Sequence, residues 1–420
     1  MSDVNYKCTI TRIDNLHPLE GLDRLVGTNV FGNQVLVGKE TKEGDLGIYF
    51  PPESQLGEGF CKVNDLIRRK DEDGKPAGGM FDENTRRVRV QKFRGHPSAG
   101  FWIPISSLDP LIGNIKDYPK EGDSFNDWDG ILLSKKYIPR TNQNNHTGLG
   151  NGQPKKKESR IIKEKFPEHM NTEHLFRNLH KIKAGDLLIF TWKLHGTSFR
   201  VGNVLVKRIL NPLEKVLHFF GVKIQETEYT HLNGSRQVIK DSNNLSQNHW
   251  YKKDLWTEIG DATFKGKLHE NEMVYGEIIG YVPGTDSLIQ KGFTYGCKEG
   301  QCEVYIYRIT RDGVDLSWEA VKQRSTELGV KYVPEVGLKD SVIQDKFYQD
   351  DYTPLEDQVK NYYLETDSHL DPSHPEEGVV CRVEGLIPQF YKAKSFRFME
   401  MESKQLDTAE VDMETAQSEN

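Results

Sequence analysis

Residues 191–200 read Thr-Trp-Lys-Leu-His-Gly-Thr-Ser-Phe-Arg, with Lys193-Leu194-His195-Gly196 at their centre. The apolar run Leu187-Leu188-Ile189-Phe190 precedes this segment and Phe199-Arg200-Val201 follows it, as in two strands joined by a short loop. This order indicates an amine fixed at a strand end, where it could act as a nucleophile. Taken alone, the segment also fits a surface lysine beside a turn glycine.

Four further segments follow in order along the chain: Tyr275-Gly276-Glu277, Val304-Tyr305-Ile306-Tyr307-Arg308, Glu377-Gly378-Val379-Val380 and Lys392-Ala393-Lys394. With the first segment, they resemble motifs I, III, IIIa, IV and V of the covalent nucleotidyltransferases, which include RNA ligases, DNA ligases and mRNA capping enzymes. His195 stands where DNA ligases and capping enzymes usually carry Asp, which resembles the RNA ligase branch related to phage RNA ligase 2. The resemblance spans roughly residues 165–400.

The resemblance implies a three-step reaction. Lys193 attacks the α-phosphate of ATP to give a lysyl-AMP phosphoramidate and pyrophosphate, AMP moves to an RNA 5′-phosphate, and a 3′-OH displaces it. A protonated lysine is no nucleophile, so nearby cations and partial burial must favour the neutral amine. Lys392, Lys394 and a divalent metal are the expected sources of that charge.

The same resemblance assigns roles around the nucleotide. Phosphoryl transfer gains most from charge stabilisation, so a lysine is expected to contact the α-phosphate. Lys394 is the preferred candidate for this contact and Lys392 is the second. Glu277 would hold the ribose hydroxyls. Glu377 would hold Mg²⁺ or Mn²⁺, directly or through water, since these ions prefer oxygen ligands. Outside these motifs, each glutamate would be read as a surface residue.

Adenine needs a flat partner, and Tyr307 aligns best with the stacking aromatic of motif IIIa. Tyr305 is expected to face the same side of its strand because side chains alternate. The alternative is that both tyrosines pack in the core. Trp192 stands where related ligases often carry Glu, which affects base selectivity only if that side chain contacts adenine.

For the phosphate-contacting arginine of motif Ia there are two candidates, Arg236 and Arg208. Arg236 is preferred, because residues 207–228 read as an inserted helix ended by a glycine. His195 is expected to order the loop around the lysine rather than act as a base, with Gly196 beside it in the nucleotide site.

The fold class expected is α+β: an N-terminal OB-like β-barrel followed by a transferase domain of two antiparallel sheets with flanking helices. Short apolar runs alternate with turn signals over residues 1–135, and basic and apolar residues interleave at 86–95, as on a barrel that tracks a nucleic acid. An ordinary sheet with a solvated basic face is the alternative, but the region also resembles that of RNA ligases that place an OB-like domain before the transferase, and this order favours the barrel. Residues 136–165 read as a basic polar linker and 166–400 as the transferase domain, with a helix expected near 316–328.

The formal charge of −7 is concentrated at one end. Residues 400–420 hold seven acidic residues and one lysine, and so contribute −6 of it. The remainder is nearly neutral, so the charge does not exclude nucleic acid as a partner. Residues 401–420 have few large apolar residues and are expected to form a disordered acidic tail.

Composition predicts a protein of the cytoplasm, of the host cell if the source is viral. No run approaches the roughly 18 apolar residues of a membrane helix, and the first residues form no apolar signal segment. The five cysteines are scattered, so free thiols are expected rather than disulfides or a zinc site.

The function predicted is an ATP-dependent RNA ligase, expected to be a monomer, that joins RNA 3′-OH and 5′-phosphate ends of nicked duplex or broken RNA, in RNA repair. One alternative is a non-catalytic RNA-binding protein on a degenerate transferase scaffold. Another is a DNA-nick ligase or capping-type enzyme, although those normally carry an OB domain after motif V, where few residues remain.

Overall fold

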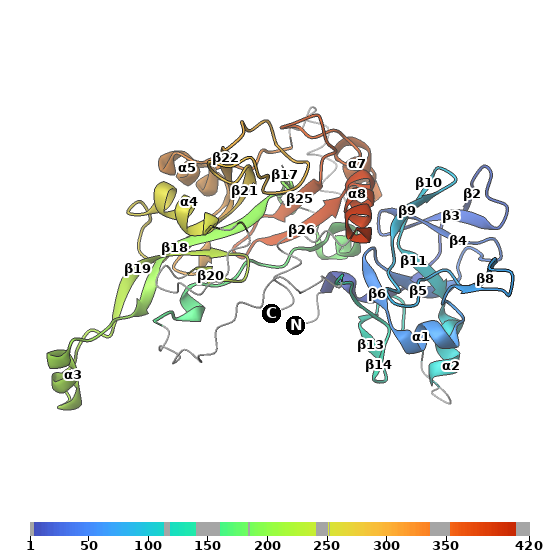
Figure 1. The fold of residues 1–420 in the computed structure, drawn as a ribbon, viewed down its shortest axis with the longest axis horizontal. Coiled ribbons are helices and arrows are strands. Elements are labelled where there is room, and N and C mark those ends of the chain that lie inside the picture. The colour runs from blue at the N-terminus through green and yellow to red at the C-terminus, as the bar shows by residue number, and fades with distance from the viewer. Residues whose placement is uncertain are drawn as a thin grey trace.

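The computed structural model describes residues 4–112, 118–139, 160–183, 185–240, 251, 253–336 and 353–408. Strands from the first 139 residues gather at one end of the molecule, and the later strands form a larger body beside them (Figure 1). Residues 140–159, most of the predicted linker, lie outside the described residues. None of the described helices is long and apolar enough to cross a membrane.

The N-terminal region consists of short strands and two short helices, as the alternation of apolar runs and turn signals predicts. They are β1 (Cys8–Arg12), β2 (His17–Pro18), β3 (Leu25–Val30), β4 (Asn33–Gly38), β5 (Leu46–Phe50), β6 (Ser54–Leu56), α1 (Glu58–Val63), β7 (Arg69–Lys70), β8 (Pro76–Gly78), β9 (Val90–Phe93), β10 (His96–Ala99), β11 (Phe101–Pro104), α2 (Asp109–Ile112), β12 (Ser124–Phe125), β13 (Asp127–Trp128), β14 (Ile131–Leu132) and β15 (Ser134–Lys136).

Strand β5 ties this region together. It lies inside the antiparallel sheet β11-β5-β1-β12, and its side chains alternate between two cores. Ile48 and Phe50 belong to the cluster that contains Ile10, whereas Tyr49 packs in the cluster that contains Trp102. A second antiparallel sheet has the order β2-β3-β4. The strands described here lie in separate sheets and form no closed barrel.

Two sheets build the larger body. Their strands are β16 (Glu173–His174), β17 (Leu188–Trp192), β18 (Thr197–Lys207), β19 (Thr227–Ser235), β20 (Ile239–Lys240), β21 (Glu272–Gly280), β22 (Cys302–Arg311), β23 (Val314–Asp315), β24 (Lys331–Tyr332), β25 (Gly378–Val383) and β26 (Gln389–Lys394). One sheet has the order β20-β19-β18-β21-β22-β23, with β24 parallel to β22; the other has the order β16-β26-β25-β17. Consecutive strands β17 and β18 therefore belong to different sheets, and the loop between them crosses from one to the other.

Helices flank both sheets. The first sheet carries α4 (Leu255–Phe264) and α5 (Trp318–Leu328), and α5 is the helix expected near 316–328. Helix α7 (Thr353–Tyr363) packs Leu355 and Val359 against Phe190 of the second sheet. The predicted mixed α+β class is therefore confirmed.

The inserted helix expected within 207–228 is present as α3 (Pro212–Phe219). Asn211 caps it: its side chain accepts from the Glu214 N–H, and the Glu214 side chain accepts from the Asn211 N–H. Figure 1 shows that α3 projects from the end of β18 and β19. Phe219 and Phe220 are largely exposed on it.

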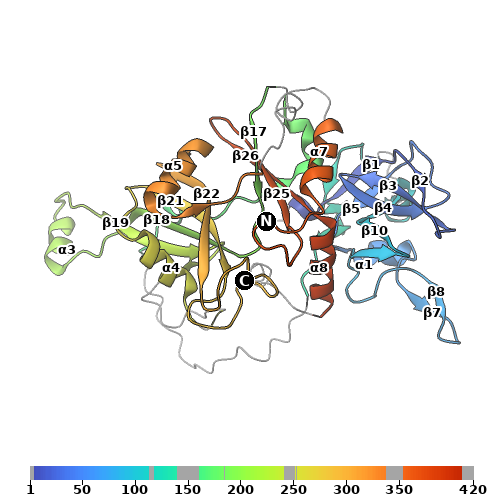
Figure 2. The same cartoon turned by 90° about the horizontal axis from the view of Figure 1, so that it is seen from above.

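The prediction of a disordered tail from residue 401 is wrong for its first part. Helix α8 (Phe396–Asp407) runs through it, capped by the Ser395 side chain and anchored by buried Phe398. Both views place α8 between the larger body and the N-terminal strands (Figures 1 and 2). Residues 409–420 lie outside the described residues.

The basic stretch 86–95 contacts α8, so the expectation that its cations follow a nucleic acid is wrong for Arg87. This guanidinium is only 5% exposed, and its Nη2 donates to the Ser403 carbonyl at 2.7 Å and to Asp407 Oδ1 at 2.8 Å. Arg89 also pairs with Asp407. The spacing of residues 86–95 shows that basic and apolar side chains alternate. It does not show which part of the protein packs against the basic side chains.

Candidate active site

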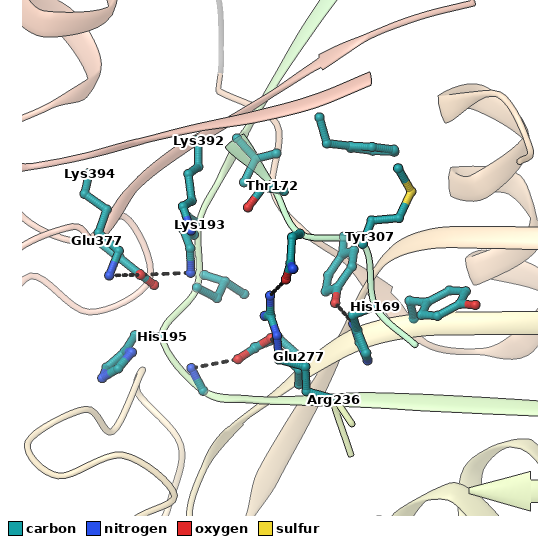
Figure 3. A pocket seen from close by; sticks show the side chains of 18 of the residues that line it. His169, Thr172, Lys193, His195, Arg236, Glu277, Tyr307, Glu377, Lys392 and Lys394 are labelled. Atoms are coloured by element: carbon teal, nitrogen blue, oxygen red, sulfur yellow. Dashed lines mark hydrogen bonds and ion pairs between the residues drawn. The ribbon is translucent and has the colours of Figure 1, made fainter. Parts of the chain in front are cut away.

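Lys193 lies in the loop that joins the two sheets. Its backbone N–H donates to the Gly378 carbonyl at 2.9 Å, next to the pairing of Trp192 with Val379 on β17 and β25. Glu377 directly precedes β25 and so comes beside the lysine, with Lys193 Nζ 2.8 Å from Glu377 Oε1 (Figure 3). Lys193 and Glu377 are 184 positions apart in the sequence, and they meet because β17 and β25 are neighbouring strands.

Lys394 reaches the same carboxylate from β26. Gly378 pairs with Lys394 across β25 and β26, and Lys394 Nζ lies 3.2 Å from Glu377 Oε1. Burial of Glu377, only 1% exposed, acts to raise its pKa, but Lys193 and Lys394 outweigh burial and hold the pKa below its ordinary value. Burial opposes the charge of Lys394 too, yet Glu402 and Glu377 raise the pKa of this amine.

Glu277 faces the loop from β21, where it pairs with Ser198 of β18. Its Oε1 accepts from the Gly196 N–H at 3.1 Å and its Oε2 from the Ser198 hydroxyl at 3.2 Å. A side chain at Gly196 would bring its Cβ within 2.2 Å of the Ile278 carbonyl, so this position requires glycine. Gln290 Nε2 donates to the Gly196 carbonyl at 2.6 Å and holds the other side of the loop.

His195 is fixed by aromatic rings. Its imidazole meets Phe293 and Phe398 edge to face, at centroid distances of 4.9 and 5.0 Å. Its backbone N–H donates to the Tyr295 hydroxyl at 2.8 Å. These contacts fit the loop-ordering role expected of His195.

Only one of the two tyrosines of β22 lines the cavity. Tyr307 lines it, and its hydroxyl lies 2.5 Å from His169 Nδ1. Tyr305 is buried in the core, with its hydroxyl donating to Glu303 Oε2 at 2.8 Å. The pairing register shifts here: Tyr275 pairs with Arg308 and the next residue with Ile306. Tyr307 is thus the extra residue of a β-bulge.

The two arginine candidates separate clearly. Arg236 lines the cavity, and its Nη2 donates to Asn171 Oδ1 at 2.9 Å. Arg208 pairs with Glu214 at 2.6 Å at the base of the projecting α3 and does not line this cavity. Asn171 and His169 belong to the lead-in segment before β17. The sequence analysis did not predict that these two residues line the cavity, because they belong to no recognised motif.

One cavity of about 630 Å³ is lined by eight of these residues: Lys193, His195, Gly196, Arg236, Glu277, Tyr307, Glu377 and Lys394. Lys392, which pairs with Val380 across β26 and β25, lines it as well. The N-terminal strands complete the wall with Tyr6, Lys135 and Lys136. Figure 3 shows Lys193, Lys392 and Lys394 on one side of the cavity, and Tyr307 with His169 on another. The size suits a nucleotide-sized ligand.

The carboxylate of Glu377 fits a hard divalent cation. Its Oε2 is buried and has no hydrogen-bond partner in the described part of the chain, whereas its Oε1 contacts both lysines. Among the described residues, no group of three or more His, Cys, Asp or Glu side chains could hold a metal. The site therefore suits an ion that keeps most of its water or takes phosphate oxygens, as Mg²⁺ does.

A family model described as RNA ligase matches residues 186–398, just over half of the chain. The chain belongs to the RNA ligase family. This confirms both the recognition of an RNA ligase of the nucleotidyltransferase superfamily from its motifs and the prediction that the protein is an enzyme. A search of curated proteins found no match.

Solved structures of a Naegleria gruberi RNA ligase share the fold of this ligase. The structure with pyrophosphate has a TM-score of 0.57 at 18% identity, covering 96% of this chain and all of that one. A variant with ATP and Mn has a TM-score of 0.57 at 18% identity, covering 94% of this chain and 98% of that one. Another variant, with AMP and Mn, has a TM-score of 0.54 at the same identity and coverage.

Proposed function

We propose that this RNA ligase is ATP-dependent and joins RNA 3′-OH and 5′-phosphate ends through a lysyl-AMP intermediate on Lys193. The observation that carries the proposal is the meeting of Lys193, Glu377 and Lys394 at the seam of two sheets, with ion-pair distances of 2.8 and 3.2 Å. Solved structures of the same fold hold ATP with Mn and AMP with Mn.

In the first step, Lys193 Nζ loses a proton and forms a bond to the α-phosphorus of ATP, while the bond to pyrophosphate breaks. Lys394 and Lys392 reach the cavity from one strand, where their charges can stabilise the α-phosphate as negative charge shifts to the leaving group. When bound, Mg²⁺ or Mn²⁺ would add Lewis-acid stabilisation of that phosphate, and Glu377 is the residue that would hold it.

The remaining side chains position the nucleotide. Tyr307 offers a ring for adenine, and its hydroxyl contacts His169 at the wall of the cavity. Glu277 would accept from the ribose hydroxyls, since its two oxygens already face the loop that carries the nucleophile. Arg236 would meet a phosphate. In the later steps, AMP passes to the RNA 5′-phosphate and a 3′-OH displaces it, restoring free Lys193.

The substrate proposed is a nicked duplex or a broken RNA, and the role is RNA repair by a monomer. We further propose that residues 1–135 form an OB-like module, which is a partly open barrel in many proteins, with a linker at 136–165 and the transferase domain at 166–400. The approach of Lys135 and Lys136 to the cavity supports a working contact between the two domains.

The test uses α-labelled ATP with Mg²⁺ or Mn²⁺ and no RNA. We expect acid-labile, base-stable label on the denatured wild-type polypeptide and none on Lys193→Ala. Lys265→Ala is the matched control, because this lysine, just after α4, is exposed and among the described residues forms an ion pair with Asp261 alone. Label on Lys193→Ala would refute the nucleophile assignment. Absence of label on wild type with ATP, GTP or NAD would favour a non-catalytic RNA-binding protein.

Sealing of a nicked RNA duplex is the second assay. Wild-type enzyme should join the nick with unlabelled ATP, and Lys193→Ala should not. If the protein forms the adduct but seals only DNA nicks, it acts as a DNA-joining ligase and the proposed RNA substrate is wrong.

A further inference from the structure

Helix α8 presents Glu402 to the active-site lysine. Both carboxylate oxygens of Glu402 lie 2.8 Å from Lys394 Nζ, closer than the 3.2 Å that separates Nζ from Glu377 Oε1. The ammonium of Lys394 also sits 5.0 Å from the Phe398 ring, one turn earlier on α8. Lys394 is thus held mainly by the helix and only secondarily by Glu377.

The next residue of α8, Ser403, forms hydrogen bonds with the N-terminal domain. Ser403 accepts from Arg87 Nη2 through its carbonyl at 2.7 Å, and its Oγ accepts from the Val90 N–H at 3.1 Å. One turn on, Asp407 Oδ1 lies 2.8 Å from the same Nη2. Neighbouring helix positions point about 100° apart. Glu402 can therefore face the cavity while Ser403 faces the other domain.

Arg87 is itself fixed on the N-terminal side. Its Nε lies 3.1 Å from Glu53 Oε2, and both side chains are largely buried. A series of contacts thus runs from Glu53 through Arg87 to α8, and from Glu402 to Lys394. Because each step includes a charged group, displacement of the helix would change the position of the lysine.

Glu402 also affects the ion pairs that Glu377 forms with Lys193 and Lys394. Lys193 and Lys394 both approach Glu377 Oε1, and none of the described residues forms a hydrogen bond with Oε2. If Glu402 lost its charge, Lys394 would keep only Glu377 as a counter-ion and would draw closer to it. That shift would move Lys394 away from the α-phosphate and would compete for the carboxylate that faces Lys193.

We propose that Glu402 is a positioning residue for adenylation of Lys193, and that the N-terminal domain sets its place by docking Arg87 against Ser403 and Asp407 of α8. The proposal rests on the lysyl-AMP function proposed above. It gives the N-terminal domain a part in the nucleotide step, before any RNA is bound.

The test is single-turnover adenylation by Glu402→Gln, which keeps the size and hydrogen-bond acceptor but removes the charge. We expect kcat to fall on the order of tenfold to a hundredfold, since misplacement of a catalytic group by about 1 Å costs that much. KM for ATP should stay near the wild-type value, as for an interaction used in the transition state. Lys404→Gln is the matched control, because Lys404 lies on the same helix, is exposed, and pairs with Glu400 one turn earlier.

Asp407→Asn tests the domain contact and remains informative if Glu402→Gln does not fold. It should lower kcat in the same way but less, and the double variant should be no slower than Glu402→Gln, because both act through one helix. Thermal melting of each variant shows whether the fold persists.

An effect of Glu402→Gln confined to KM, or a rate within twofold of wild type, would overturn the positioning role. An unchanged rate for folded Asp407→Asn would overturn the domain coupling. Wild type and Lys193→Ala are run alongside. If wild type forms no adduct, the proposed function fails; if it does and Glu402→Gln matches it, only this inference fails.

Discussion

Replacement of Tyr307 should weaken ATP binding without unfolding the protein. The ring lines the cavity as the extra residue of a β-bulge, and its hydroxyl contacts His169 at 2.5 Å. Stacking of a base on an aromatic side chain contributes about 1–3 kcal/mol by alanine substitution. At about 1.4 kcal/mol for each factor of ten, Tyr307→Ala should raise the Kd for ATP about fivefold to 140-fold.

Calorimetric titration of ATP in a Lys193→Ala background gives this Kd without turnover. Tyr307→Phe keeps the ring and should bind nearly as well, because only the hydroxyl contact is lost. Tyr305→Phe is the neighbouring control: its hydroxyl contacts Glu303 away from the cavity, so ATP affinity should not change. A Kd for Tyr307→Ala within twofold of its parent would refute the stacking assignment. Equal losses for the alanine and phenylalanine variants would assign the effect to the hydroxyl.

Two further predictions concern stability. Arg324 donates to both carboxylate oxygens of buried Glu272, at 2.8 and 2.9 Å. Arg324→Ala should therefore lower the free energy of unfolding, measured by urea titration, by about 3–5 kcal/mol. A loss below about 1 kcal/mol would contradict this prediction. Burial raises the pKa of Glu53 to about 7 although Arg87 opposes it, so this carboxyl contributes stability below its ordinary pKa that is lost as pH rises through 7. The loss is about 3 kcal/mol; denaturation curves of wild type relative to Glu53→Gln should show it between pH 4.5 and 8, and a constant difference would refute it.

The residues that line the cavity could be predicted from the sequence because their motifs and order resemble those of the covalent nucleotidyltransferases. The roles predicted from that resemblance are a lysine nucleophile, carboxylates for ribose and metal, and cations for phosphate. The structure brings Lys193, Glu277, Glu377, Lys392 and Lys394 to one cavity. Sheet pairing explains why distant motifs meet, as with Gly378 opposite Lys394.

Other features depend on partners that no local pattern reveals. Tyr305 and Tyr307 have the spacing of one strand face, yet only Tyr307 lines the cavity, because Tyr305 is buried in the core with its hydroxyl on Glu303. Residues 401–407 have the composition of a disordered tail, yet they are helical because Ser403 and Asp407 bind Arg87, more than 300 positions earlier in the chain. Helices draw most of their stability from such tertiary contacts.

The contacts of Glu377 give the reaction an order. Its Oε1 holds Lys193 and Lys394 together, so in this structure the ammonium of Lys193 is engaged in an ion pair and its nitrogen cannot attack. A cation at Oε2 would compete with both lysines for the charge of this carboxylate; Lys394 then keeps Glu402 as a counter-ion, whereas among the described residues Lys193 pairs with Glu377 alone. In the function proposed above, filling of the cavity by nucleotide and metal would therefore free Lys193 for attack while Lys394 stays paired with Glu402.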